Sequence, residues 1–169
     1  MLYRTEMKKI FFPVAICAIV LHFLSCAKEE CNRNISNDAG MGFYTFQDSI
    51  ETMAGIKTLS LFGEARPDSL LYDSVQNATS VRLPLDPNKD FSHFVFRIAS
   101  QQDTVKINYS RQLHFISQAC GFIMDFHIQD IGTTHHLFDS VVMTEPNVTL
   151  NSDEEHIKIY LPPPDTTGQ

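Results

Sequence analysis

The sequence predicts an all-β fold, an antiparallel β-sandwich of immunoglobulin-like size with about nine strands. From Gly42 onward, apolar and polar residues alternate with a period of two, and aromatic and β-branched residues are frequent. Turn-forming residues separate these stretches at regular intervals. No stretch has the capped 3.6-residue apolar periodicity of a helix. These observations favour a sandwich, with a closed up-and-down barrel as the alternative.

The clearest predicted hairpin joins residues 93–98 to residues 105–109 through a turn at 100–103, with Phe94, Phe96 and Ile98 on one face. Pro84 lacks a backbone N–H group and therefore marks an edge strand or a strand end. Residues 70–74 have the character of a short edge segment. The other strands are expected at 43–46, 57–62, 80–85, 113–117, 122–129, 140–144 and 157–161.

The N-terminus has the pattern of a lipoprotein signal peptide over residues 1–25. Lys8 and Lys9 precede an apolar run of about 15 residues, which is too short to span a bilayer and has the length of a secretory signal. The run ends in Leu24-Ser25-Cys26, which resembles the lipobox of bacterial lipoproteins, although Phe23 stands where leucine is usual. We therefore expect lipidation of Cys26. The alternative is an ordinary signal peptide in which this cysteine is coincidental.

The residues after the lipidated cysteine bear on localisation. Lys28-Glu29-Glu30 resembles a surface-export signal of one group of Gram-negative bacteria, and the alternative is a solvated charged tether. We expect a lipid-anchored protein of the outer membrane and leave open whether it faces the cell surface or the periplasm. The expected organisation is a tether over 26–41, one domain over 42–161 and an extended Pro-rich tail over 162–169.

Composition limits the size and partners of the mature chain. Its 144 residues suffice for one domain with a core. Once Arg4, Lys8, Lys9 and Glu6 leave with the signal, 10 basic and 19 acidic residues give a formal charge of −9. No basic patch is present to follow a phosphate backbone, so nucleic-acid binding is disfavoured.

Two cysteines remain after Cys17 leaves with the signal and Cys26 takes lipid. In an exported protein, Cys31 and Cys120 favour a disulfide. Such a loop is worth about 4–5 kcal/mol in the chain-entropy model. A metal pair or free thiols are the alternatives, although no clustered ligand spacing supports a metal.

Catalytic signatures are absent from the sequence: there is no G-x-S-x-G, P-loop or dinucleotide fingerprint. His127, His135 and His136 form the only tempting metal cluster, but two are adjacent in a loop and need not converge. We interpret them as surface histidines. We expect no metal, no cofactor and no enzymatic activity.

A triplet of Asp, then Ser or Thr, then an apolar residue or Thr occurs six times, whereas roughly one or two would be expected from composition. The triplet resembles an O-glycosylation acceptor of exported proteins. Turn chemistry is the alternative, because Asp-Ser pairs bond readily to nearby backbone. The hydroxyl residues are Ser49, Ser69, Ser74, Thr104, Ser140 and Thr166.

Several short segments of the mature chain match the pattern of a known family. They are Glu30-Cys31, Leu83-Pro84-Leu85-Asp86, Asp103-Thr104-Val105, Tyr109-Ser110-Arg111, Ser117 with Cys120-Gly121-Phe122, and His156-Ile157-Lys158-Ile159-Tyr160. Through these segments, which span most of the mature chain and match most closely over residues 81–161, the chain resembles an uncharacterised family of small bacterial envelope lipoproteins, a domain of unknown function. The resemblance implies that the Cys31–Cys120 pairing is a family feature, and it implies no activity.

The leading functional hypothesis is a non-enzymatic interaction or assembly module displayed from a lipid anchor, with envelope proteins or glycans as partners. A second hypothesis is glycan or small-ligand binding on an aromatic sheet face, for which Tyr44, Phe46, Tyr109 and Tyr160 are candidates. A third is an enzyme of unfamiliar type, which requires a buried acidic pair or convergent histidines in a pocket.

Overall fold

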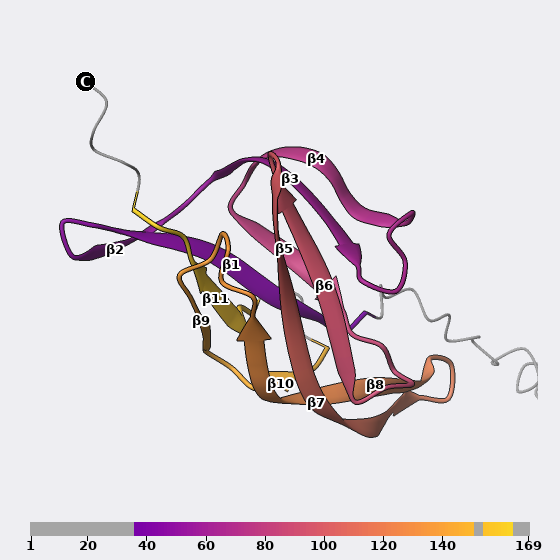
Figure 1. Ribbon diagram of the computed structural model, residues 1–169. Coiled ribbons are helices and arrows are strands. Elements are labelled where there is room, and N and C mark those ends of the chain that lie inside the picture. Colours follow the sequence, from indigo (N-terminus) through magenta and orange to yellow (C-terminus); the bar gives the residue numbers. More distant parts are fainter. Residues whose placement is uncertain (1–35, 151–153, 164–169) are drawn as a thin grey trace, which may run out of the picture. The chain divides into compact units, whose positions relative to one another are not determined.

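The computed structural model describes residues 36–150 and 154–163. The described residues 36–116, 122–150 and 154–163 belong to one compact unit, and Ser117–Gly121 fall in a second. The described residues form eleven strands and no helix (Figure 1). Over the same residues, no helix has the length and hydropathy needed to cross a membrane.

The first sheet is built around β1 (Asp38–Gln47). β11 (Ile157–Tyr160) pairs with one edge of β1 in parallel, and β9 (Ser140–Met143) continues the sheet beyond β11. The opposite edge of β1 is shared end to end by two antiparallel strands. β5 (Ser80–Pro84) pairs with residues 38–42, and β2 (Ile50–Met53) pairs with residues 44–47. Three strands therefore depend on the position of β1.

The second sheet has the order β10-β8-β7-β6-β3-β4. Its strands are β3 (Ile56–Gly63), β4 (Leu70–Ala78), β6 (Phe91–Ile98), β7 (Gln101–Ser117), β8 (Gly121–Thr133) and β10 (Asn147–Val148). β10 and β4 are edge strands that do not meet. The predicted all-β sandwich is thus confirmed, and the alternative of a closed barrel is wrong.

The core lies between the two sheets. The first sheet contributes the inward residues Met41 and Phe43, and the second contributes Leu59, Phe96 and Ile107, all at most 1 % exposed. The ring of Phe96 makes edge-to-face contacts with Phe43 at 6.2 Å and with Phe138, from the β8–β9 loop, at 5.4 Å. Each such side chain contributes about 1.5–3 kcal/mol through burial.

The predicted hairpin is present as β6 and β7, with Ile98 opposite Gln101 and a turn in which Ala99 has a φ of 53°. The strand count differs because the sequence analysis did not predict β2 or β10. The stretches predicted at 105–109 and 113–117 are parts of one 17-residue strand, β7. The sheets are also not wholly antiparallel, because β1 pairs with β11 in parallel.

The folded domain begins before the predicted residue 42. β1 starts at Asp38, and Ala39 and Met41 are core residues, so the tether predicted over 26–41 is too long. The sequence analysis missed the start of this strand because it contains Gly40 and Gly42, and glycine is unfavourable in strands. A side chain at Gly40 would collide with the backbone of Glu154, and one at Gly42 with the carboxylate of Glu155. Glycine is therefore needed at position 40, where the opposing atom is backbone, whereas at position 42 the opposing atoms belong to side chains.

Asp103 is a buried carboxylate, 1 % exposed, at the start of β7. It accepts hydrogen bonds from the Thr134 hydroxyl at 2.5 Å and from the backbone N–H groups of His136, Leu137 and Phe138 at 2.7–2.9 Å. Burial raises the pKa of Asp103, but these hydrogen bonds outweigh burial and lower the pKa to about 2. The carboxylate fixes the β8–β9 loop, and with it Phe138 in the core.

We expect Asp103→Asn to lower the free energy of unfolding by about 2 kcal/mol at pH 7. The side-chain NH2 group of asparagine would face backbone N–H groups, which would then lose their acceptor. The stabilisation from Asp103 is present above its unfolded pKa of 3.8 and is lost as pH falls toward about 2. Urea unfolding between pH 7 and pH 2 should therefore show the deficit shrinking in acid.

Asp130→Asn is the matched control for Asp103→Asn. Asp130 is exposed on β8 and accepts one hydrogen bond, from Asn108 at 3.2 Å. Its replacement should change the free energy of unfolding by less than about 0.5 kcal/mol. Equal losses in the two variants would contradict the role assigned to Asp103.

Candidate functional site

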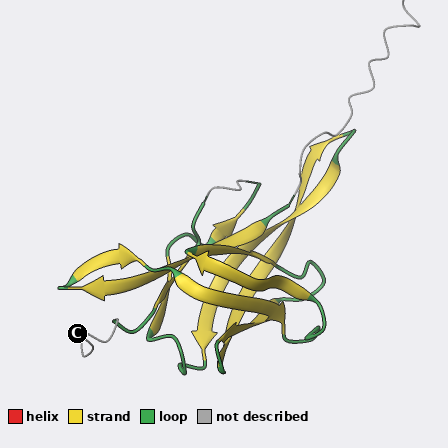
Figure 2. Cartoon of the chain, turned by 90° about the horizontal axis from the view of Figure 1, so that it is seen from above, coloured by secondary structure: helices red, strands yellow, loops and turns green. Residues whose placement is uncertain are grey.

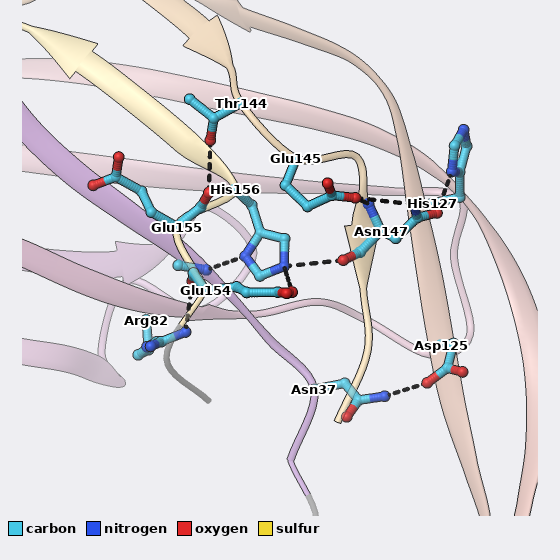
Figure 3. Close-up of polar contacts among 11 residues, drawn as sticks. Asn37, Arg82, Asp125, His127, Thr144, Glu145, Asn147, Glu154, Glu155 and His156 are labelled. Atoms are coloured by element: carbon cyan, nitrogen blue, oxygen red, sulfur yellow. Dashed lines mark hydrogen bonds and ion pairs between the residues drawn. The ribbon is translucent and has the colours of Figure 1, made fainter. Parts of the chain in front are cut away.

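A buried polar junction surrounds His156, whose side chain is fully buried beside β1 and β10 (Figure 3). The Gly40 N–H of β1 donates to His156 Nδ1 at 2.9 Å, and Nε2 lies 3.1 Å from the Asn147 carbonyl oxygen of β10. Since Nδ1 accepts, the proton resides on Nε2 and is donated to Asn147. Backbone bonds add to the junction, because the His156 N–H donates to the Gly40 carbonyl.

The chemistry of this junction is structural. Both ring nitrogens of His156 are occupied by backbone groups, so neither is available to accept or deliver a substrate proton. Burial lowers the pKa of His156 and outweighs the raising effect of the Asn147 carbonyl and of Glu154. The histidine is therefore neutral at physiological pH.

The polar groups around the junction bond to one another. Glu145 accepts from the Asn147 amide, and Asn147 Oδ1 bonds to His127 Nδ1 at 2.8 Å. Asn37 donates to Asp125 at 2.7 Å (Figure 3). Within residues 36–150 and 154–163, no three His, Cys, Asp or Glu residues are grouped to hold a metal ion.

A second cluster lies on the outer surface of the first sheet, and we call it the aromatic face. It consists of Tyr44 and Phe46 from β1, Glu51 from β2, and Lys158 and Tyr160 from β11. The alternation that buries Met41, Phe43 and Thr45 places Tyr44 and Phe46 outward. Ile157 and Ile159 are buried in the same way, so Lys158 and Tyr160 also point outward. Register brings these residues together, with Tyr44 opposite Tyr160 and Phe46 opposite Glu51.

The rings of the aromatic face pack on one another. Phe46 stacks on Tyr160 with centroids 5.2 Å apart and planes 7° from parallel, and Tyr44 lies 6.2 Å from Tyr160. The Lys158 ammonium lies 4.4 Å from the centroid of the Tyr44 ring, within range of a cation–π interaction. Stacking fixes the orientation of these side chains before any partner binds.

The polar groups of the aromatic face are also paired. Glu51 accepts from Lys158 at 2.5 Å and from the Tyr160 hydroxyl at 2.7 Å, and these hydrogen bonds lower the pKa of Glu51. The bond to Glu51 raises the pKa of both Lys158 and Tyr160. Burial, followed by the hydrogen bond to Glu155 at 2.9 Å, raises the pKa of Tyr44. None of these shifts favours proton transfer near neutral pH.

Exposed apolar side chains lie on the aromatic face and along its border. Phe46 is 47 % exposed, and the adjoining Met53, opposite Tyr44 on β2, is 60 % exposed. Val142 of β9, opposite Lys158, is also exposed. An exposed apolar surface with rings at its centre is suited to binding another molecule.

The sequence analysis named Tyr44, Phe46, Tyr109 and Tyr160 as candidates for an aromatic face. The prediction for Tyr109 is wrong, because this side chain is 1 % exposed, lies in the core beneath the second sheet and packs edge-to-face on Phe126. Glu51, Lys158 and Met53 were not identified. The missed signal is the Asp48-Ser49 pair, both with positive φ, which forms a two-residue hairpin turn and brings β2 beside β1.

The predicted anchor and export residues lie outside the described residues: Cys26, Lys28, Glu29, Glu30 and Cys31, and also Thr166. Cys120 lies within Ser117–Gly121, where its N–H donates to Ser117 Oγ at 3.1 Å. Gly121 follows with a φ of 71°, which glycine adopts without strain. The Cys31–Cys120 disulfide stays a prediction.

Four of the predicted O-glycosylation sites, Ser49, Ser69, Ser74 and Ser140, are exposed. Thr104 is half-buried within β7, opposite Val95, and follows the buried Asp103. This Asp-Thr pair has a structural explanation, and a glycan on a half-buried ladder residue is sterically disfavoured. Modification of the four serines stays a prediction.

The three histidines considered as a possible metal site each have a different hydrogen-bond partner. His127 bonds to Asn147, His135 Nδ1 lies 3.2 Å from the Phe138 carbonyl, and His136 Nδ1 lies 3.0 Å from Asp103. The structure gives each a local hydrogen-bonding role.

Comparison with protein families matches residues 58–161 to DUF6452, a family of unknown function. The match includes all the resemblance segments except Glu30-Cys31, so the resemblance to an uncharacterised family is confirmed. No curated protein and no solved structure matches the chain.

His156→Gln should remove part of the acid sensitivity of the protein. The pKa of His156 is lowered in the folded state, so below about pH 6.5 the unfolded chain takes up a proton that the folded chain does not. Wild-type stability should therefore fall as pH decreases from 7 to 5, and the slope should be smaller in the variant. At pH 7 the variant should be less stable by about 1–3 kcal/mol.

His127→Gln serves as the control for His156→Gln, because His127 is exposed. Thermal unfolding of the three proteins at several pH values provides the comparison. An identical pH slope in wild type and His156→Gln would contradict the assigned role.

Proposed function

The chain belongs to the DUF6452 family, a family of unknown function, and we propose that it is a non-enzymatic binding module displayed from a lipid anchor on the outer membrane. The aromatic face is its binding surface. The anchor rests on the lipobox-like Leu24-Ser25-Cys26, and the predicted Cys31–Cys120 disulfide joins the tether to the domain.

The observation that supports this proposal most strongly is that the aromatic face is exposed, its rings are held in place by stacking, and its polar groups hydrogen-bond to one another. Its rings are stacked, and the charges of Glu51 and Lys158 neutralise each other. Recognition would therefore depend on apolar and aromatic contact, with the paired polar groups at its side. This composition, aromatic with an apolar border, is that of a protein–protein contact centre.

Glycan binding at the same surface is the second candidate. The exposed Phe46 stacks on Tyr160, and sugar rings stack on such surfaces. Glu51 and Lys158, both beside these rings, supply an acceptor and a donor for sugar hydroxyls if their own bond opens. Protein binding is preferred because it does not require these bonds to break.

The anchor is tested by mass spectrometry of protein isolated from membranes. The mature chain should begin at an acylated Cys26, and Cys26→Ser should abolish both acylation and membrane retention. Tryptic digestion without reduction should yield residues 29–33 joined to the peptide that contains Cys120. Membrane retention of an unacylated chain would contradict the anchor, and a free Cys31 peptide would contradict the disulfide.

The binding surface is tested by placing a photo-crosslinking phenylalanine analogue at position 46 in living cells. We expect a discrete adduct from position 46, because a bound partner covers this ring. Position 91 is the matched control, since Phe91 is similarly exposed, at 42 %, but lies on β6 of the other sheet.

The nature of the adduct separates the two candidates. After tryptic digestion, a second peptide joined to the peptide that contains position 46 indicates a protein partner, and an added mass that glycosidases remove indicates a glycan. Identical patterns at positions 46 and 91, or no adduct at 46, would contradict binding at the aromatic face.

A further inference from the structure

The distal part of the β7–β8 hairpin carries a second exposed apolar surface. Leu113, Phe115 and Phe122 are 59 %, 52 % and 62 % exposed. The rings of Phe115 and Phe122 contact each other edge-to-face at 5.1 Å, so they share one side of the hairpin. We call these three residues the hairpin apolar patch.

The patch arises because the hairpin is longer than the core it covers. The alternation that buries Val105, Ile107 and Tyr109 in β7 continues in the sequence to Leu113 and Phe115. The burial ends at Tyr109, although β7 continues to Ser117. Figure 2 shows this part of the hairpin projecting past the remaining strands. Core-type residues are thus extended beyond the core.

The neighbouring charges do not make the patch a site for a charged partner. The Arg111 guanidinium is bonded to Asp90 at 2.9 Å and to the Pro87 carbonyl at 2.8 Å. His114 Nδ1 lies 2.8 Å from Asp125. With these groups paired, the patch offers its occupant apolar contact.

The length of chain between anchor and hairpin indicates the occupant. Only four residues lie between the predicted lipid-bearing Cys26 and Cys31, so the five steps from one to the other reach at most about 18 Å. A disulfide brings Cys120 to within about 6 Å of Cys31, measured between Cα atoms. Phe122 follows Cys120 by two residues. The stretch of chain that connects the patch to the bilayer surface is therefore shorter than the thickness of a bilayer.

The tether itself is a poor cover for the patch. Residues 27–35 read Ala-Lys-Glu-Glu-Cys-Asn-Arg-Asn-Ile, with Ile35 as the one large apolar side chain. Such a segment cannot bury two phenylalanines and a leucine. An apolar surface held at a membrane is instead stabilised by burying its area in the bilayer.

We propose that the hairpin apolar patch inserts into the interfacial region of the phospholipid bilayer that holds the anchor. Leu113, Phe115 and Phe122 are the inserted side chains. This inference rests on the proposed lipid anchor and disulfide, and it gives the domain a fixed orientation on the membrane. Because the adjacent charges are paired, insertion requires no anionic lipid.

The absence of tryptophan from the chain provides a direct test. Phe115→Trp and Phe122→Trp each introduce a single fluorophore at an exposed position, and Phe46→Trp is the matched control. Phe46 is similarly exposed, at 47 %, but lies on the β1–β2 hairpin, which projects from the opposite side of the strands (Figure 2). The lipidated full-length mature protein is reconstituted in phosphatidylcholine vesicles with brominated acyl chains.

Tryptophan at 115 and at 122 should emit at shorter wavelength and be quenched several-fold more strongly than tryptophan at 46. Equal, weak quenching at all three positions in protein that floats with the vesicles would overturn insertion while leaving the anchor intact. A concentration-dependent blue shift without bromine quenching would overturn it in favour of a second copy of the chain. If the wild-type protein isolated from membranes carries no acyl group and does not float with the vesicles, both the anchor and this inference are overturned.

Discussion

The hydrogen bonds of the buried His156 side chain hold the two sheets in register at the point where β1 and β10 meet. The ring accepts from the Gly40 N–H and donates to the Asn147 carbonyl, so it satisfies one backbone group in each sheet. Without it, the buried Gly40 N–H would lack this acceptor, at a cost of about 1–3 kcal/mol. β1 is the strand on which β2, β5 and β11 all pair. The aromatic face, which is assembled from β1, β2 and β11, therefore depends on this junction indirectly.

Three of the sequence segments that carry the family resemblance correspond to buried polar junctions. One contains His156, and another contains Asp103, which fixes the β8–β9 loop. The third contains Tyr109, whose hydroxyl donates to the Asp86 carbonyl and accepts from the Asp86 N–H, both at 3.0 Å, within the Leu83–Asp86 segment. These segments therefore specify how loops attach to the sheets. Buried polar groups of this kind favour one arrangement because alternatives leave them unsatisfied, so the resemblance identifies an architecture and leaves the binding surface to other residues.

Alternation and turn residues were sufficient to predict the all-β class, the β6–β7 hairpin and the placement of Phe94 and Phe96 on one face of their strand. They were insufficient where tertiary contacts override local preference. β1 contains Gly40 because the backbone of Glu154 packs directly on it, although Glu154 is over 110 residues away in sequence. Tyr109 and Tyr160 have similar local patterns, yet one is in the core and one on the surface. The pairing of β1 with β11, which creates the aromatic face, is a long-range event that no local pattern encodes.

A sandwich of this size uses the inner surfaces of both sheets for its core, so contacts with other molecules must use outer surfaces, edges or projecting hairpins. The described chain has one exposed aromatic cluster on the β1–β2 side and another on the β7–β8 hairpin. Their environments differ in one respect that matters. Beside the rings of Phe46 and Tyr160, Glu51 accepts hydrogen bonds from Lys158 and from the Tyr160 hydroxyl, and such a polar border suits a protein partner. Around Phe115 and Phe122, the exposed surface is apolar and its charges are paired to the side, which suits lipid. The two hairpins project in opposite directions (Figure 2), so insertion through β7 and β8 would leave the β1–β2 hairpin, which carries Phe46 and Glu51, away from the bilayer, where a partner can reach it.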